Sequence, residues 1–436
     1  MTVYHHRSSD FVSKHILSKW RKGEWLNNFV TQDVTLSHSP SVFPSPDCDF
    51  QDNNIRTRIS FEFKPYTETK RGMMTGVGQS IAYLKKANAS YLISPSVIDD
   101  LQMENYLNDL FQKFIKGKLP VGLIIYDGVD LSNIRLKCDI DSTLSPSTPV
   151  ELTNTSYWCF WRDLPPDGFY KLSKSAEFVT DKTERSEKVW DYFFYNFYTP
   201  LNTRNTLDLI ESEIFMWDYQ NKMIPFSTTK RKLTSDVNAG SLSLDEALNL
   251  LKKKWSKNET DNLYRDYKKN YINFMNHNNL WDENFYLTPL GKKFVMRYEQ
   301  NYDNKLQLID EITQIILVEG KYDNLITDIK TATQSFTILN DDNTYLKELY
   351  KYFDSNGFIA KNPNRTTSGI REFFQSEKQL LRKLDLIEMN RDRFFNLNKG
   401  YLFKNERKEK LIEEFYKNYG DVSSIYDNES ISLNLN

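Results

Sequence analysis

Residues 46–64 read PDCDFQDNNIRTRISFEFK, and this stretch decides the fold of the N-terminal region. Apolar and polar residues alternate on both sides of the turn-forming run Asp52-Asn53-Asn54, and this pattern predicts a β-hairpin. Because successive side chains of a strand point to opposite faces, Glu62 and Lys64 should share one face of the second strand.

Helical and strand patterns alternate around this hairpin. The predicted elements are helical regions over residues 11–30, 75–86 and 99–115 and short buried strands over residues 89–93 and 121–126. Alternation of this kind predicts an α/β domain over residues 1–150, in which a central mixed sheet is flanked by helices.

The hairpin also brings together residues that suit metal-dependent hydrolysis. It would place Asp47 across from Glu62, near the backbone carbonyl of Phe63 and the side chain of Lys64. Phosphodiester cleavage needs a cation that neutralises charge and activates water, and Mg²⁺ binds oxygen ligands while keeping several waters. Lys64 could orient or help deprotonate the water, or stabilise developing charge. Asp49 lies on the same face as Asp47, so either aspartate can be the metal ligand, and we favour Asp47.

These residues resemble a known motif. Pro46 and Asp47, followed by Glu62, Phe63 and Lys64, are similar to the signature of the PD-(D/E)xK nucleases, the restriction-endonuclease-like superfamily. The resemblance covers residues 1–125. It implies that Asp47 and Glu62 bind the metal and that Lys64 is the catalytic lysine, while the Phe63 carbonyl is a further metal ligand suggested by the hairpin geometry alone.

A second element extends the resemblance. Gln79 and Tyr83 lie one helical turn apart on one face, and they resemble the QxxxY element that some branches of the superfamily carry after the lysine strand. The resemblance implies that Gln79 and Tyr83 help to hold the strand that carries the lysine or contact DNA phosphates, and it implies the element order α-β-β-β-α-β. The alternative is a surface hairpin with an ordinary Glu/Lys ladder.

The C-terminal half carries a motif of another kind. Residues 285–294 read FYLTPLGKKF and resemble the wing-to-helix passage of winged-helix domains. The resemblance spans residues 243–300, and Ser243 with Glu246 forms a capping-box signature at its start. Such domains commonly place a helix in the major groove of DNA, but they also serve as scaffolds or dimerisation modules.

A second unit of similar pattern follows, with a predicted helix over residues 369–384 and a hairpin formed by residues 386–389 and 394–397. Arg, Lys and Gln side chains can recognise base edges, and Ser at a helix start can contact phosphate. The alternative is an amphipathic core helix whose outer face is merely solvated. The candidate DNA contacts of this unit are Arg365, Ser368, Arg371, Gln375, Lys378, Arg391 and Arg393. Candidates elsewhere are Arg56, Arg58 and Arg71 beside the nuclease motif and Lys230 and Arg231 in a polar linker.

The predicted fold is therefore multidomain, with an α/β restriction-endonuclease-like core followed by mostly α-helical winged-helix-like domains. The aromatic-rich region over residues 157–198 should fill a core or an interdomain contact, with base stacking as the alternative. The predicted division is a nuclease core (1–150), an aromatic-rich extension and linker (151–240), a winged-helix-like domain (241–305), a second winged-helix-like DNA-recognition domain (306–420) and an acidic tail (421–436).

Composition limits the functional class. The formal net charge of -2 hides local basic stretches, because residues 56–88 hold seven Lys/Arg against two acids. The three cysteines form no CxxC pair and no His/Cys cluster is visible, which disfavours a disulfide framework or a zinc site. No apolar run approaches the roughly 20 residues of a membrane helix, so we expect a cytoplasmic protein without membrane association.

Together these features predict an enzyme, a type II site-specific deoxyribonuclease that uses Mg²⁺ to cut double-stranded DNA. The expected partners are DNA, a cognate DNA methyltransferase and a second copy of the chain, because two strands must be cut. The alternatives are a structure-dependent repair or anti-phage nuclease and a non-catalytic winged-helix DNA-binding protein.

Overall fold

The chain forms two compact units that interleave along the sequence. The computed structural model describes residues 4–37, 45–128, 130–146, 166–193, 227–255, 262–300, 305–336, 342–359, 374–388, 395–396 and 400–420. Unit 1 comprises Met1–Trp158, Lys321–Phe374 and Phe395–Gly400, and unit 2 comprises Cys159–Gly320, Gln375–Phe394 and Tyr401–Asn436. The predicted acidic tail over residues 421–436 lies outside the described residues.

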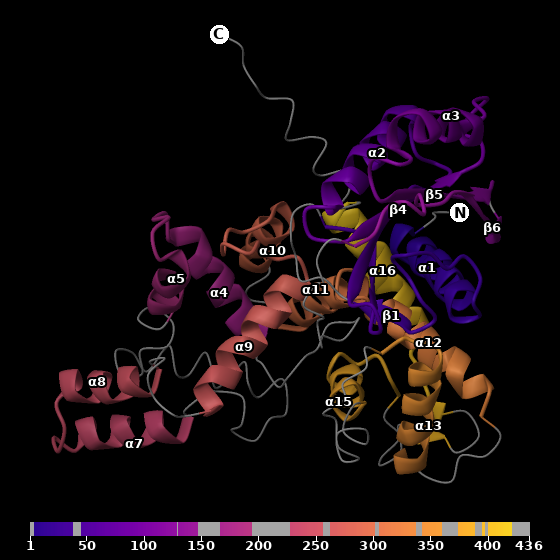
Figure 1. Ribbon diagram of the computed structural model, residues 1–436. Helices are drawn as coiled ribbons and strands as arrows, with labels where there is room; N and C mark the ends of the chain where they lie inside the picture. Colours follow the sequence, from indigo (N-terminus) through magenta and orange to yellow (C-terminus); the bar gives the residue numbers. More distant parts are fainter. Residues whose placement is uncertain are drawn as a thin grey trace. The chain divides into compact units, whose positions relative to one another are not determined.

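Unit 1 is built on a six-stranded mixed sheet whose strands lie in sequence order (Figure 1). The β3–β4 and β4–β5 pairs are parallel, and the β1–β2, β2–β3 and β5–β6 pairs are antiparallel. The strands are β1 (Val34–Ser37), β2 (Cys48–Asp52), β3 (Thr57–Phe63), β4 (Ala89–Pro95), β5 (Val121–Asp127) and β6 (Asp130–Cys138). The predicted α/β region with a central mixed sheet is confirmed, as is the order α-β-β-β-α-β at its start.

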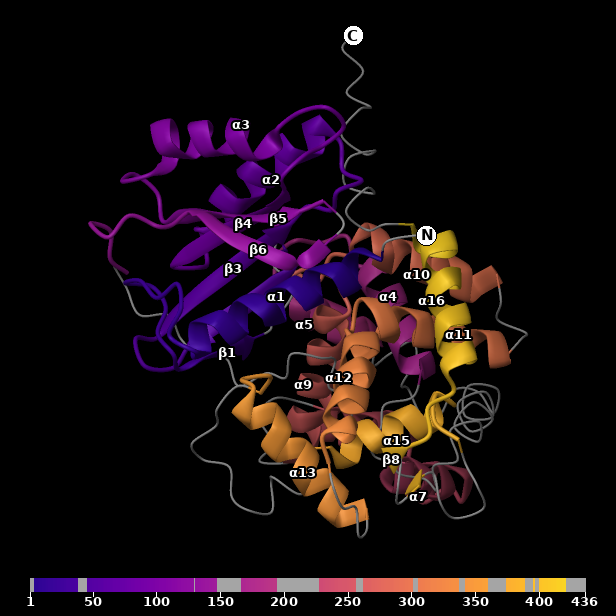
Figure 2. The same ribbon diagram turned by 90° about the vertical axis from the view of Figure 1, so that its right-hand side faces the viewer.

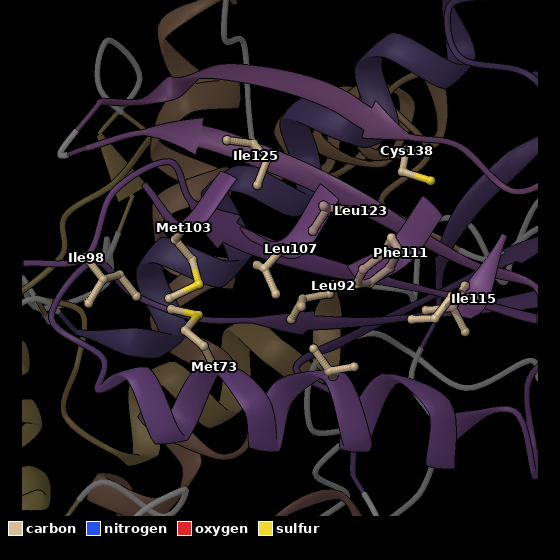
Figure 3. Close-up of a cluster of buried hydrophobic side chains, with 12 residues drawn as sticks. Met73, Leu92, Ile98, Met103, Leu107, Phe111, Ile115, Leu123, Ile125 and Cys138 are labelled. Atoms are coloured by element: carbon tan, nitrogen blue, oxygen red, sulfur yellow. The ribbon is translucent and has the colours of Figure 1, made fainter. Parts of the chain in front are cut away.

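Helices cover both faces of this sheet (Figure 2). Helix α1 (His5–Arg21) lies on one face, where the Trp20 ring packs against Phe50 and Phe61. Helices α2 (Lys70–Tyr83) and α3 (Met103–Leu110), with a π-helical turn over Phe111–Ile115, lie on the other. Buried aliphatic and sulfur-containing side chains fill the space between these helices and the sheet, and each contributes about 1.5–3 kcal/mol by burial (Figure 3).

The hairpin forms as the sequence predicts. Strand β2 pairs with β3 in a register that places Cys48 opposite Phe61 and Asp52 opposite Thr57. The Asp52 carboxylate accepts hydrogen bonds from the backbone N–H groups of Asn54 and Ile55, at 2.9 and 3.0 Å, and so stabilises the turn.

Three features of unit 1 differ from the prediction. Helix α1 ends at Arg21 rather than near residue 30, and Gly23 follows with a φ of +87°. The sequence pattern assigned no residues to strands β1 and β6, because β1 has only four residues and the half-exposed edge strand β6 carries mostly polar side chains. Residues 321–374, expected in a second winged-helix-like domain, group with the N-terminal sheet as helices α12 (Tyr322–Gln334) and α13 (Asp342–Ser355).

Unit 2 is mostly helical, as predicted for the region after the α/β core. Its helices are α4 (Pro166–Phe178), α5 (Arg185–Phe193), α7 (Ser227–Asn238), α8 (Leu244–Trp255), α9 (Asn262–His277), α10 (Pro289–Gln300), α11 (Lys305–Val318), α15 (Gln375–Lys383) and α16 (Asn405–Tyr419). Trp190 and Phe193 are buried beside Tyr271, so these rings fill a core. The polar segment expected to form a linker around Lys230 and Arg231 is helical, as helix α7.

The passage into α10 has a clear physical basis. Ser243 and Glu246 form the predicted capping box at the start of α8. Trp281 bridges Leu287 in antiparallel fashion, and the Thr288 hydroxyl accepts a hydrogen bond from the Gly291 N–H at 3.0 Å. A Cβ atom at Gly291 would lie 1.9 Å from the Leu280 carbonyl oxygen, so this position requires glycine. The predicted hairpin leading into a helix is present here.

The second predicted hairpin is wrong in its pairing. Ile387 bridges Phe403, and strand β7 (Phe395–Asn396) pairs with β8 (Gly400–Tyr401). Both predicted strands therefore pair with residues 400–403 and not with each other. Local periodicity does not specify which strands pair. None of the described helices combines the length and the apolar content needed to cross a membrane.

Candidate active site at the open end of the hairpin

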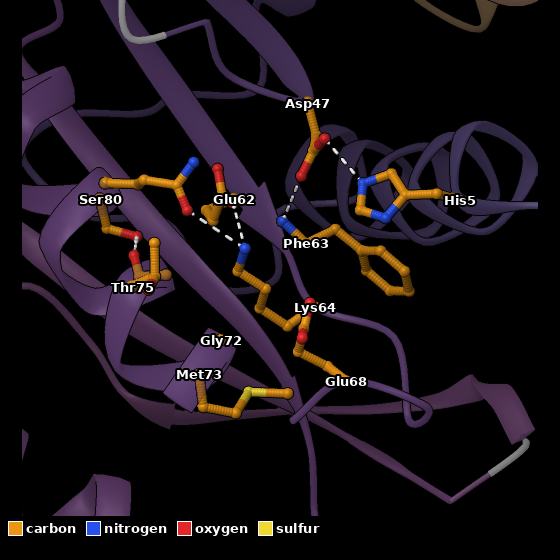
Figure 4. Close-up of polar contacts among 12 residues, drawn as sticks. His5, Asp47, Glu62, Phe63, Lys64, Glu68, Gly72, Met73, Thr75 and Ser80 are labelled. Carbon is orange, nitrogen blue, oxygen red and sulfur yellow. Dashed lines mark hydrogen bonds and ion pairs between the residues drawn. The ribbon is translucent and has the colours of Figure 1, made fainter. Parts of the chain in front are cut away.

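Asp47 lies immediately before β2 and is held against the end of β3 (Figure 4). Its backbone N–H donates to the Phe61 carbonyl at 3.0 Å, and its Oδ2 accepts a hydrogen bond from the Phe63 N–H at 2.7 Å. The hairpin register therefore continues past Cys48, and it brings Asp47 level with Glu62.

Two further groups contact Asp47. The Nε2 atom of His5, in the first turn of α1, lies 2.8 Å from Asp47 Oδ1, and the Lys321 amine donates to the Asp47 carbonyl oxygen at 2.8 Å. Burial raises the pKa of the Asp47 carboxyl, but the charge and hydrogen bond of His5, helped by the Phe63 N–H, outweigh it and hold this pKa below its ordinary value. Asp47 is therefore ionised at neutral pH.

Glu62 and Lys64 form a buried ion pair beside Asp47. Lys64 Nζ lies 2.9 Å from Glu62 Oε1 and donates to Gln79 Oε1 at 3.1 Å, while the Tyr83 hydroxyl donates to Glu62 Oε2. Glu62 is 4% exposed and Lys64 is 5% exposed. Burial, followed by the negative charge of Asp47, raises the pKa of Glu62 to about 7. Burial lowers the pKa of Lys64, but the Glu62 carboxylate more than reverses this and leaves the pKa raised.

A glycine in α2 makes room for the lysine. The side chain of Lys64 runs under the helix at Gly76, where an added Cβ would lie 2.7 Å from Lys64 Cε and 3.1 Å from Leu92 Cδ1. Thr69 caps the helix by accepting the Gly72 N–H, and this cap fixes where α2 starts above the sheet. Helix α2 thus positions Gln79 and Tyr83 over the ion pair.

The residues present fit a hard divalent cation. Asp47 and Glu62 are close enough for the charge of one to raise the pKa of the other, and a cation between them would stabilise both ionised forms. In the described part of the chain, no group of three or more His, Cys, Asp or Glu side chains is arranged for a metal. An ion that keeps several of its waters, as Mg²⁺ does, needs few protein ligands, so two carboxylates could hold it.

The structure also separates the two candidate aspartates. Asp49 lies within β2 opposite Ser60, is buried, and accepts a 2.5 Å hydrogen bond from the Ser60 hydroxyl. It is therefore two residue pairs further into the sheet than Asp47. Asp47, and not Asp49, therefore contacts Phe63. The contact is made by the Phe63 N–H, so a metal-binding role for the Phe63 carbonyl stays a prediction.

The predicted DNA contacts are only partly placed. Arg56 is exposed in the hairpin turn and Arg58 is half-buried near the start of β3, and the two lie about 20 and 13 Å along the strand from Glu62. Their contact with DNA stays a prediction, as does that of Arg71, which is exposed in the first turn of α2. Lys378 is half-buried in α15. The side chains of Lys230, Arg231 and Gln375, and the whole of Arg365, Ser368, Arg371, Arg391 and Arg393, lie outside the described residues.

Two members of the site were not found by sequence reasoning. His5 precedes the motif by 42 positions, and Lys321 follows Asp47 by 274 positions. Neither has a local pattern that links it to the hairpin, because both arrive through helix packing. Comparison with protein-family models gave no match, and no curated protein matched the sequence. The function of the site is therefore inferred from its own residues and geometry.

Proposed function

We propose that this chain is a Mg²⁺-dependent endonuclease of the PD-(D/E)xK type that hydrolyses phosphodiester bonds of double-stranded DNA. The observation that carries the proposal is the buried Glu62–Lys64 pair, 2.9 Å apart, beside Asp47 at the open end of one hairpin. A surface Glu/Lys ladder would be exposed, and burying two charges costs several kcal/mol per ion unless they are well paired. Such burial is typical of a functional site.

The site residues suggest a division of labour. A bound Mg²⁺ would neutralise charge on the phosphoryl group and lower the pKa of an attacking water, with Asp47 and Glu62 as its ligands. The raised pKa of Lys64 keeps its amine protonated at neutral pH, so we assign it to stabilising negative charge on the phosphate rather than to removing a proton. Gln79 and Glu62 orient that amine, and Tyr83 holds Glu62.

We further propose that unit 2 reads the DNA and that the enzyme is a type II restriction endonuclease, partnered in the cell by a methyltransferase that protects the same sequence. The support is the capped hairpin-to-helix passage from Trp281 to α10, which suits a winged-helix role. Cutting both strands requires two such sites, so the active form would be a homodimer on DNA.

Single substitutions test the catalytic assignment. Glu62→Ala and Lys64→Ala should abolish Mg²⁺-dependent cleavage of supercoiled plasmid while leaving DNA binding intact in a gel-shift assay. Loss of Glu62 removes a negative charge, so binding should hold or tighten. Asp109→Ala and Lys113→Ala, which remove the partners of an exposed carboxylate–lysine pair in α3 and the π-helical turn after it, are the matched controls and should cleave like the wild type. Retained cleavage by both Ala variants would overturn the assignment.

A further inference from the structure

The Lys321 amine is the most distant contact of the candidate site in sequence. It donates to the backbone carbonyl of Asp47 at 2.8 Å. The N–H of Asp47 already donates to the Phe61 carbonyl, so Lys321 holds the opposite side of the same residue. With both backbone groups of Asp47 bonded, the direction of its Cα–Cβ bond is set, and the contacts with His5 and the Phe63 N–H then hold the carboxylate.

Lys321 is carried to this point by helix α12, which is anchored on α1. Asp323 is fully buried and accepts hydrogen bonds from His6 Nε2 at 2.9 Å and from Arg7 Nε at 2.5 Å. Further along, Lys14 Nζ lies 2.5 Å from the Asp328 carboxylate. His6 follows His5, which itself contacts Asp47, so α1 and α12 converge on one aspartate.

The backbone of Lys321 is also unusual. It has φ +58° and ψ +24°, in the left-handed region, which costs a residue with a side chain about 1–2 kcal/mol. A glycine at position 321 would adopt this conformation freely. A lysine therefore occupies a position that favours glycine, as do seven other non-glycine residues of the described chain, and the contact with Asp47 is what distinguishes Lys321.

The place of Lys321 in the chain gives this contact a consequence. Helix α11 of unit 2 ends at Val318 and α12 of unit 1 begins at Tyr322, so only three residues connect them. We propose that Lys321 is a positioning residue for Asp47, and that the nuclease site is completed only by the segment that follows the first part of unit 2, Cys159–Gly320. This inference rests on the proposed function, and it adds that residues 1–158 do not hold the whole catalytic unit.

Metal binding tests the proposal without relying on cleavage. In full-length protein, Lys321→Met should weaken Mn²⁺ binding by about tenfold in calorimetry, the effect of one charge-assisted hydrogen bond, and raise the Mg²⁺ concentration for half-maximal cleavage similarly. Loss of a nearby positive charge would by itself tighten cation binding, so weaker binding identifies positioning. Lys321→Arg should recover part of the affinity, and Lys330→Met, on the exposed face of α12, should match the wild type.

The outcomes separate the two proposals. If Lys321→Met binds Mn²⁺ as tightly as the wild type or more tightly, the positioning role is refuted, whatever the cleavage assay shows. If the wild type binds Mn²⁺ at a site lost in Asp47→Asn but cuts no DNA, the proposed nuclease function fails while weakened binding by Lys321→Met still supports positioning. A wild type that binds no Mn²⁺ overturns both. Thermal unfolding of each variant, with Lys321→Gln as a second substitution, confirms that the comparison is between folded proteins.

Discussion

Gly76→Ala should lower the cleavage activity of this protein while leaving its free energy of unfolding nearly unchanged. The added methyl would lie 2.7 Å from Lys64 Cε, whereas carbon atoms in contact are ordinarily about 3.5 Å apart. The lysine side chain must therefore move by roughly 0.8 Å. Because its amine is tied to Glu62 and Gln79, the movement displaces the amine from its working position.

The expected magnitudes follow from this displacement. A misplacement of about 1 Å in an active site can cost roughly a hundredfold in rate, so we expect cleavage to fall about 10- to 100-fold. The free energy of unfolding should change by less than about 1 kcal/mol, because alanine gains about 1 kcal/mol of helix propensity over glycine and this offsets the steric cost.

Gly78→Ala is the matched control on the same helix. An added Cβ there meets no atom within 4 Å, so the substitution should stabilise the protein by about 0.5–1 kcal/mol and leave cleavage unchanged. Plasmid-cleavage rates at saturating Mg²⁺ and urea unfolding of both variants make the comparison. If Gly76→Ala cleaves as fast as Gly78→Ala, Lys64 does not need the position seen under α2, and the reasoning about its role is wrong.

Three other predictions concern charge, the hydroxyl of Tyr83 and the folding of unit 2. In metal-free protein, the raised pKa of Glu62 means that stability falls as the pH rises from about 4.5 to about 7, because the unfolded chain ionises this carboxyl more readily. Urea unfolding in a chelator should show this fall, and Glu62→Gln should reduce it; an unchanged fall would contradict the assigned cause. Tyr83→Phe should fold normally but cleave about tenfold more slowly, as checked by circular dichroism and plasmid cleavage, since Glu62 Oε2 loses its donor. Gly291→Ala should destabilise unit 2 by about 3 kcal/mol or more in chemical unfolding, because its Cβ would collide with the Leu280 carbonyl; a stable variant would show that this close approach is not needed.

Much of unit 1 could be predicted because its signals are local. The alternation around Asp52 and the pairing of Glu62 with Lys64 follow from a period of two and from turn composition. The same local rules located the capping box at Ser243 and the hairpin before α10. Local rules therefore predicted the hairpin and placed Glu62 and Lys64 of the candidate site on one face of its second strand.

The remaining features depend on contacts between distant segments. His5 and Lys321 reach Asp47 only because α1 and α12 are joined by buried charges such as Asp323, and no periodic pattern encodes that pairing. Strand β6 was missed because an edge strand with a polar, half-exposed sequence has no apolar alternation. The choice between Asp47 and Asp49 likewise needed the observed hydrogen bonds to Phe63 and Ser60.

The central claim is that Asp47, Glu62 and Lys64 form a Mg²⁺-dependent site that cuts double-stranded DNA. The most direct measurement incubates the wild type and Glu62→Gln with Mg²⁺ and a panel of modified and unmodified plasmids, followed by sequencing of the ends. We predict discrete fragments with defined ends from the wild type only, and none when Mg²⁺ is chelated. A smear, or cutting confined to branched or single-stranded DNA, would favour a structure-dependent nuclease over a restriction enzyme. The absence of any cleavage by the wild type, or equal cleavage by Glu62→Gln, would contradict the claim.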